Sequence, residues 1–418
     1  MGEGNNTMLG QDISPVQISD FFAAERRLRQ SFPPSPLLSM APLDQQLGAP
    51  VYLKAESLLP SGAYKIRGAT NKIMALSQEV GASLRIITAS SGNHGMACAL
   101  SAKRLGIPAT IVVPEPTPEI KKSSIRAMGA DLLEIGATYD ETFAATVALA
   151  EEKRMYYVHP TSDRYTVAGQ GTISLELLRQ LPDVDQIVVP IGGGGLITGI
   201  SYAMKHLKPG VRIVGVMPEG SAVYAASRAA GKLMTLDSCA SIADAVVRKT
   251  GEPYLYPYIE EYVDDIVTVS EDETAAAILS LMENQKLVAE GAGAVPVAAA
   301  LFHKLPIEGK KTVCLISGGN IDVNILSRVI TRGMVMSGRK TNLMIALEDK
   351  PGQLSLVSDI VSACGANVVS VHHDRSDANM AITSCFLKLG LETRDAAQIE
   401  TIKQKLTEAG FKLVTERA

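Results

Sequence analysis

The sequence predicts an α/β protein built on parallel strands, followed by a small α+β domain. Two observations support this prediction. From residue 51 to about residue 330, short continuous apolar runs alternate with segments of helical periodicity, as expected for parallel strands covered by helices on both faces. From residue 342 onward the order becomes strand–helix–strand–strand–helix–strand, which is the ferredoxin-like arrangement.

The elements of the first part follow closely on one another. An opening helix is expected at residues 14–31, before a proline-rich stretch. Strands are expected at residues 51–53, 84–89, 109–113, 131–135, 186–190, 212–217 and 312–316. Later helices are expected at residues 69–78, 96–105, 119–128, 139–153, 167–180, 197–206 and from about residue 321 to residue 330.

The last part of the chain is expected to be a separate domain. Residues 1–330 form the predicted main body, residues 331–341 lose the periodicity and are expected to be a linker, and residues 342–418 form the small domain. Its strands are expected at residues 343–347, 367–371, 381–389 and 411–415, and its helices at residues 354–364 and 399–409.

Composition excludes several classes of function. A net charge of −4 gives no basic footprint for nucleic acid or an anionic membrane, and no apolar run approaches the length of a membrane span. The first eleven residues are polar and lack the features of a signal peptide. The five cysteines are scattered without metal-ligand spacing, so we expect reduced thiols in a cytoplasmic protein.

Lys65 is the first candidate for chemistry. It follows the turn signal Pro60-Ser61-Gly62 and precedes a helical run, among small and apolar residues. Loss of hydration in such surroundings lowers the pKa of an amine, and a neutral amine can form a Schiff base or accept a proton from carbon. On this stretch alone, a surface lysine at a helix start is the simpler interpretation.

Three turns of small residues each follow a predicted parallel strand, where ligands bind in doubly wound sheets. They are Ser90-Ser91-Gly92-Asn93-His94, Gly192-Gly193-Gly194-Gly195 and Ser317-Gly318-Gly319-Asn320. The four glycines allow close approach of an anion to the next helix, and they fit neither the Rossmann nor the Walker A pattern. A flexible turn is the alternative for the glycines, a plain helix cap is the alternative for the first turn, and His94 is expected to be structural.

Taken in order, these segments resemble the fold-type II pyridoxal-phosphate enzymes, the tryptophan synthase β-like group, and within it the threonine and serine dehydratases and serine racemase. The matching pieces cover residues ~35 to ~330. They are Leu53-Lys54-Ala55-Glu56, Gly62-Ala63-Tyr64-Lys65-Ile66-Arg67-Gly68-Ala69, the three turns above, Ala168-Gly169-Gln170-Gly171-Thr172 and Glu290-Gly291-Ala292-Gly293-Ala294.

The resemblance implies a two-lobed body, with a smaller lobe at residues 65–160, and the cofactor pyridoxal 5′-phosphate (PLP) bound to Lys65. It also implies that Asn93 contacts the phenolic oxygen of the cofactor, that Gly192, Gly193, Gly194, Gly195 and Leu196 hold the phosphate, and that Ser317 faces the pyridine nitrogen. Ser90, Ser91, Gly92, Asn93 and His94 would receive the substrate carboxylate, with Ser91 also assigned a catalytic role.

The sequence departs from the family pattern in three places. Ala63-Tyr64 replaces the usual Ser-Phe before the lysine, and the usual Phe is absent after His159-Pro160. Glu219 matches one carboxylate of a divalent-cation site found in racemase-like members, but the second acidic position falls near Tyr224. We therefore predict no bound metal, and the preference for the substrate side chain stays open.

The small domain resembles the ACT domain, an amino-acid-sensing module. The resemblance implies that Gly352, Gln353 and Leu354, together with Asn367 and Val368, bind a branched-chain amino-acid effector. The alternative is a stabilising appendage that binds nothing. Symmetric pairing of the small domain would give a homodimer or homotetramer.

The leading hypothesis for function is threonine ammonia-lyase activity, with L-serine as a second substrate. A hydroxyl such as that of Ser317 cannot hold a pyridine nitrogen protonated as a carboxylate would, which favours prompt loss of a β-hydroxyl group. Serine racemase is the alternative, favoured by the hydroxyl of Ser91. A β-replacement synthase or a catalytically silent amino-acid sensor is less favoured.

Overall fold

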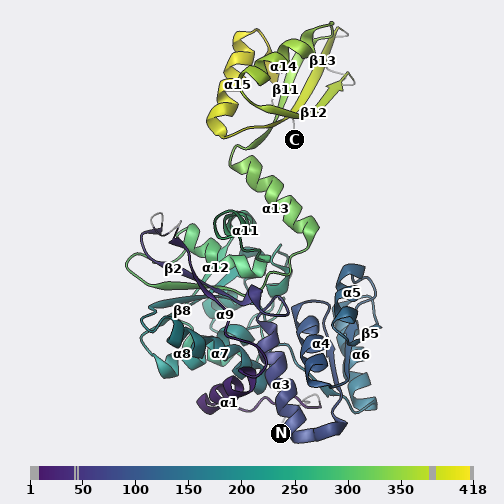
Figure 1. Ribbon diagram of the computed structural model, residues 1–418, viewed down its shortest axis with the longest axis vertical. Coiled ribbons are helices and arrows are strands. Elements are labelled where there is room, and N and C mark those ends of the chain that lie inside the picture. Colours follow the sequence, from purple (N-terminus) through teal and green to yellow (C-terminus); the bar gives the residue numbers. More distant parts are fainter. Residues whose placement is uncertain (1–8, 42–43, 45–46, 376–382, 415–418) are drawn as a thin grey trace. The chain divides into compact units, whose positions relative to one another are not determined.

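The computed structural model describes residues 9–41, 44, 47–375 and 383–414, and the chain divides into two compact units at Asp322/Val323. The first unit contains two parallel sheets and the second one antiparallel sheet (Figure 1). The expected parallel α/β body is therefore confirmed, and so is the different, strand–helix–strand–strand–helix–strand order of the elements after it. Within the described residues, no helix is both long enough and apolar enough to cross a membrane.

The larger lobe of the first unit is built on a six-stranded sheet with the order β1-β2-β10-β7-β8-β9. All neighbouring strands are parallel except β1, which runs antiparallel to β2. The strands are β1 (Leu37–Ser39), β2 (Val51–Ala55), β7 (Gln186–Pro190), β8 (Arg212–Pro218), β9 (Asp265–Val269) and β10 (Thr312–Ile316). The helices are α1 (Ile18–Leu28), α7 (Arg164–Gln180), α8 (Gly195–Leu207), α9 (Val223–Ala230), α10 (Tyr256–Tyr262), α11 (Glu271–Gln285) and α12 (Gly291–Leu301).

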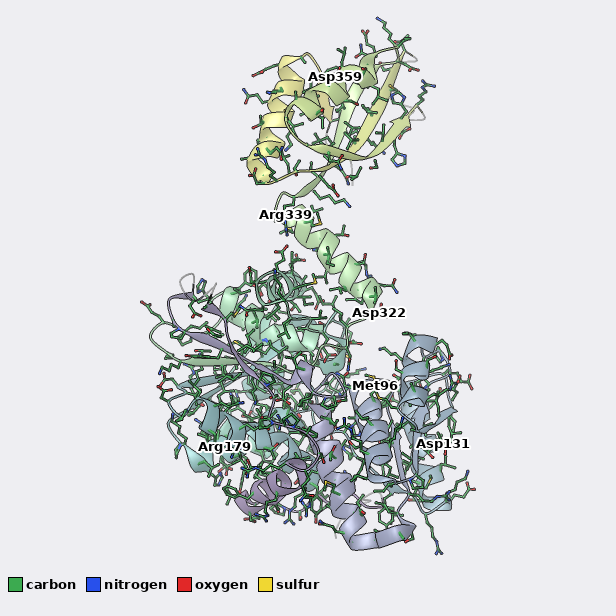
Figure 2. The ribbon with its side chains drawn as sticks, in the orientation of Figure 1. Met96, Asp131, Arg179, Asp322, Arg339 and Asp359 are labelled. Carbon is green, nitrogen blue, oxygen red and sulfur yellow. The ribbon has the colours of Figure 1, made fainter. Side chains whose placement is uncertain are left out.

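The smaller lobe is built on a four-stranded parallel sheet with the order β5-β4-β3-β6. Its strands are β3 (Ile86–Ala89), β4 (Ala109–Val113), β5 (Asp131–Glu134) and β6 (Tyr156–Tyr157), and its helices are α4 (Asn93–Leu105), α5 (Glu119–Ala127) and α6 (Tyr139–Glu152). Met96 and Asp131 lie in this lobe, whereas Arg179 lies on α7 in the larger lobe (Figure 2).

Helix α3 (Lys65–Val80) joins the two lobes, because it packs against both α4 and α7. Glycines allow the close contact with α7. A Cβ atom at Gly169 would lie 2.7 Å from the carbonyl oxygen of Arg67, and one at Gly68 would lie 2.8 Å from that of Thr166. The position of Lys65, at the first residue of α3, therefore depends on small residues in both helices.

A buried ion-pair cluster anchors the same helix. The guanidinium of Arg67 binds the carboxylates of Glu56 and Glu176, and the Lys54 ammonium binds Glu176 at 2.6 Å. These side chains are at most 9% exposed. Four charges of alternating sign therefore tie β2 and α7 to the first turn of α3.

The second unit begins with α13 (Val323–Met336) and continues as one α+β fold. Its elements are β11 (Lys340–Glu348), α14 (Gln353–Ala363), β12 (Asn367–Asp374), β13 (Ser384–Glu392), α15 (Ala396–Glu408) and β14 (Lys412–Val414). The antiparallel sheet has the order β12-β13-β11-β14, as in a ferredoxin-like fold. Its core includes Ile345, Val357, Leu387 and Ile402.

Some boundaries differ from those expected. Residues 331–341 are not an irregular linker, because α13 continues to Met336 and β11 begins at Lys340. The opening helix is shorter than residues 14–31. Residues 219–311, for which no element was expected, contain α9 to α12 and β9. Parts of the expected N-terminal tail (residues 1–8) and of two expected strands (residues 381–382 and 415) lie outside the described residues.

Candidate active site

Lys65 lies where the sequence placed it, at the junction of a turn and a helix. Its side chain is half-buried, and its Nζ donates a hydrogen bond to the Pro160 carbonyl at 2.7 Å. Burial, with a further contribution from the positive charge of Arg248, lowers the pKa of Lys65 to about 7. A substantial share of the amine is therefore neutral and nucleophilic at neutral pH.

Two other lysines nearby are chemically different. Lys54 binds the carboxylate of Glu176 at 2.6 Å, and Lys72 binds that of Asp163 at 2.7 Å. Among the described residues, Lys65 has no carboxylate within ion-pair distance, and only a neutral carbonyl accepts its hydrogen bond. Of these three lysines, Lys65 is the one whose amine is available for covalent chemistry.

The turn before Lys65 is joined to the turn after β10. Tyr64 N–H donates to the Ser317 carbonyl at 2.9 Å, and Gly319 N–H donates to the Gly62 carbonyl at 2.9 Å. Gly62 has a φ of +73°, and a Cβ atom there would lie 2.3 Å from Asn320 Oδ1. A glycine is therefore required at Gly62, and Ser317 is held beside the base of α3. The hydroxyl of Ser317 makes no hydrogen bond within the described part of the chain, although the residue is 2% exposed.

The first predicted turn forms the start of α4. Gly92 is the N-cap residue, and no side-chain cap hydrogen bond is present in the described part of the chain. The N–H groups of the first turn therefore lack intrahelical partners and can bind an anion. Asn93 donates through Nδ2 to the Glu290 carboxylate and accepts at Oδ1 from Asn320. Ser91 is half-buried.

His94 differs from the other residues of this turn. Its imidazole is 3% exposed, and Nε2 lies 2.8 Å from the Val158 carbonyl. Burial and the nearby charge of Lys65 lower the pKa of His94 to about 3, so the ring is neutral. The structural role expected for this side chain fits these contacts, and a contribution to substrate binding would come from its backbone N–H.

The four glycines occupy the β7–α8 turn. Gly194 has a φ of +94° and is the N-cap of α8, for which the described residues likewise supply no side-chain cap hydrogen bond. A Cβ atom at Gly193 would lie 2.8 Å from Thr161 Cγ2, and one at Gly192 would lie 2.9 Å from Val246 Cα. Tyr224 donates its hydroxyl hydrogen to the Gly193 carbonyl at 3.1 Å, which fixes the turn. Leu196 follows in the first turn of α8, with its side chain buried.

The segment after β6 brings the glycine turn and Lys65 together. The carbonyl of Pro160 accepts the hydrogen bond from Lys65, and the next residue, Thr161, packs against Gly193 and Gly195. A phosphorylated aldehyde fits this arrangement. The cradle of glycines at an uncapped helix would take the phosphate, and the amine of lowered pKa would take the aldehyde carbon.

Three charged residues of the site received no role in the sequence analysis. Glu290 is 4% exposed, and burial raises its pKa to about 7. Glu252 accepts hydrogen bonds from the hydroxyls of Ser162 and Thr161. Arg248 is half-buried, and its charge acts on Lys65. Glu290 begins the family-like motif Glu290-Gly291-Ala292-Gly293-Ala294, so the sequence could have indicated it as a site residue. Arg248 and Glu252 lie within residues 219–311, where no element was predicted and no pattern indicated them.

The residues predicted to bind an effector are not brought together within one copy of the second unit. Gly352 is the N-cap of α14, with a φ of +92°, and follows the end of β11 at which Glu348 pairs with Ser384. Asn367 pairs with Glu392, at the opposite end of β13. The eleven residues of α14 span ~16 Å between these ends. One small molecule cannot touch both groups in a single copy.

Comparison with known proteins gives consistent results. A family model described as pyridoxal-phosphate dependent enzyme matches residues 28–319. An L-threonine ammonia-lyase of Thermotoga maritima is 41% identical over 398 residues, covering 95% of this chain and 99% of the relative.

Solved structures of similar proteins agree. The structure of maize serine racemase has a TM-score of 0.71 at 35% identity, covering 77% of this chain and 99% of that one. The processed form of threonine deaminase isoform 2 from Solanum lycopersicum also has a TM-score of 0.71, at 32% identity, covering 79% of this chain and 94% of that one.

Proposed function

The chain belongs to the family of pyridoxal-phosphate-dependent enzymes, and we propose that it is an L-threonine ammonia-lyase. It would convert L-threonine to 2-oxobutanoate and ammonia. As a second, slower activity it would convert L-serine to pyruvate and ammonia. The observation that carries the proposal is the amine of Lys65, which is hydrogen-bonded to the Pro160 carbonyl and to no carboxylate among the described residues, beside a glycine cradle for phosphate. The similarity to the Thermotoga maritima ammonia-lyase over nearly both whole chains supports this choice of reaction.

The site residues predicted from sequence would have the following roles in this reaction. Bound PLP withdraws electrons from Cα of the amino acid, which makes the Cα hydrogen acidic. Lys65 would hold the cofactor, and its amine, when neutral, would accept that proton. The N–H groups at the start of α4, which lack intrahelical partners, would bind the substrate carboxylate together with the hydroxyl of Ser91. Ser317 would face the pyridine nitrogen, and the turn of four glycines would hold the phosphate.

Substrate preference tests the proposal. Purified protein with PLP is incubated separately with L-threonine, L-serine and D-serine, while 2-oxo acids and serine enantiomers are measured together. The expected result is 2-oxobutanoate formed from L-threonine faster than pyruvate from L-serine. Lys65→Ala is the control and should give neither product. No 2-oxo acid from either L-amino acid would refute the proposal.

Serine racemase activity is the second candidate. The similarity to maize serine racemase favours it, and so does the presence of a hydroxyl-bearing residue, the half-buried Ser91, in the turn before α4. The same experiment separates the two, because a racemase forms D-serine from L-serine faster than it forms pyruvate. The racemase structure covers 77% of the chain, whereas the ammonia-lyase match covers 95% and so includes most of the second unit.

The second unit is proposed to be an ACT-like regulatory domain that pairs with its copy in another subunit. Strand β12 is a sheet edge, and Val369 and Val371 on it are 46% and 44% exposed. An unpaired apolar edge of this kind needs cover, which symmetric pairing supplies. Antiparallel pairing of β12 with its copy would put Asn367 of one copy at the same end of the joined sheet as Gly352 of the other, as a shared effector site requires.

A substitution on the edge strand tests this pairing. Val371→Lys should lower the association state and abolish any response of threonine kinetics to isoleucine or valine. Leu356→Lys is the matched control, because Leu356 is 53% exposed on α14 and lies off the edge. If neither amino acid changes the kinetics or thermal melting of the wild-type enzyme, the regulatory role is wrong. If Val371→Lys leaves the association state unchanged, the pairing surface lies elsewhere.

A further inference from the structure

A directed chain of hydrogen bonds fixes the amide of Asn93. It starts at the Ser61 carbonyl, which can only accept a hydrogen bond, so Asn320 must present Nδ2 to it, at 2.9 Å. The other hydrogen of Asn320 Nδ2 goes to Asn93 Oδ1 at 2.8 Å. Asn93 Nδ2 must then face Glu290, whose two carboxylate oxygens lie 2.9 and 3.0 Å away.

This series of hydrogen bonds leaves one N–H of the Asn93 amide without an acceptor among the described residues. The amide of Asn93 has two N–H hydrogens, and a carboxylate that lies on one side of the nitrogen takes one of them. The remaining hydrogen belongs to a residue at the start of α4, close to the turn that leads into Lys65. The orientation of this donor therefore depends on Glu290 and Asn320, which come from two distant parts of the chain.

Glu290 is held in place by its surroundings. It is the N-cap residue of α12, its N–H donates to the Gly318 carbonyl at 3.0 Å, and its side chain is buried. A Cβ atom at Gly318 would lie 2.5 Å from Glu290 Oε1, so the turn after β10 closes over the carboxylate. Within the described residues, the Glu290 carboxylate has Asn93 as its hydrogen-bond partner. The charges of Lys65, Lys121 and Asp244 act on this carboxylate without forming an ion pair with it.

We propose that Glu290 is a positioning residue that acts through Asn93, holding the free N–H of the amide toward the phenolic oxygen of the bound cofactor. A buried carboxylate with a single amide donor is costly to maintain, and capping α12 does not require it, since the Glu290 side chain makes no cap hydrogen bond. The inference rests on the proposed function only for the identity of the cofactor. It concerns cofactor binding and not the choice of substrate.

A double-mutant cycle tests this role, with the visible absorbance spectrum and dissociation constant of PLP as readouts. Glu290→Ala should change the absorbance of the bound cofactor and raise its dissociation constant by about 3–10-fold, the worth of one hydrogen bond. Asn93→Ala should produce the same changes. Adding Glu290→Ala to Asn93→Ala should then produce almost no additional change.

Glu290→Gln separates positioning from general stability. The amide oxygen of glutamine can accept from Asn93 Nδ2, so this variant should recover most of the spectrum and affinity lost in Glu290→Ala. Thermal melting identifies any variant that fails to fold. If Glu290→Ala leaves the spectrum unchanged, or has its full effect in the Asn93→Ala background, the proposal is wrong. Both readouts use PLP and no amino acid, so they stand even if L-threonine is not the substrate.

Discussion

Removing Arg67 should destabilise the catalytic body strongly, because its charge is matched by two buried carboxylates. Its guanidinium makes four hydrogen bonds to Glu56 and Glu176, and its side chain is 1% exposed. Among the described residues, Arg67→Met leaves Glu56 with only the Ser35 hydroxyl as donor, whereas Glu176 keeps Lys54. Breaking a buried pair in this way costs about 3–5 kcal/mol of unfolding free energy.

Arg126→Met is the matched control. Arg126 also binds two glutamates, Glu119 at 2.7 Å and Glu134 at 3.0 Å, but its side chain is 47% exposed. Solvent screening limits such pairs to about 0–1 kcal/mol. Equilibrium urea denaturation of the two variants and the wild type measures both losses.

A third variant tests the cause of the loss. Adding Glu56→Gln to Arg67→Met removes the unpaired carboxylate and should restore part of the stability, because the cost is mainly that of a buried charge. Equal losses for Arg67→Met and Arg126→Met, or no recovery on adding Glu56→Gln, would refute this reasoning.

Two further predictions concern the site. Because burial lowers the pKa of Lys65 to about 7, the rate of PLP attachment to cofactor-free enzyme should rise with pH up to about 7 and then level off; a rate that keeps rising toward pH 10.5 would contradict this. Ser317→Asp should slow threonine turnover by about 10–100-fold, because a carboxylate would keep the pyridine nitrogen protonated. An unchanged kcat would mean that Ser317 does not face that nitrogen.

The parallel strands were predictable because their apolar runs are continuous. Strands β7 and β10 have the bounds expected from sequence, and every residue in them is buried. By contrast, α12 is apolar on all sides and contains Pro296, so it has no helical stripe to detect. Strand β9 is mostly half-exposed and lacks a continuous buried run. The loss of helical periodicity after residue 330 suggested a linker, yet α13 continues through Gly333.

The individual turns of the site were also predictable, but their connections were not. Lys65 and the turn of four glycines were visible as local patterns after strands. The contact of Asn93 with Glu290 joins residues 197 positions apart, and no local pattern encodes such a pairing. The same holds for Pro160, whose carbonyl binds Lys65 across 95 positions. These contacts follow from the arrangement of the two lobes.

The measurement that tests the account most directly is the location of the cofactor on the chain. The holoenzyme is reduced with borohydride, digested, and analysed by mass spectrometry for the phosphopyridoxyl group. The account predicts that this group is on Lys65, and that Lys54 and Lys72, each paired with a buried carboxylate, are unmodified. A phosphopyridoxyl group on another lysine, or on none, would contradict the account.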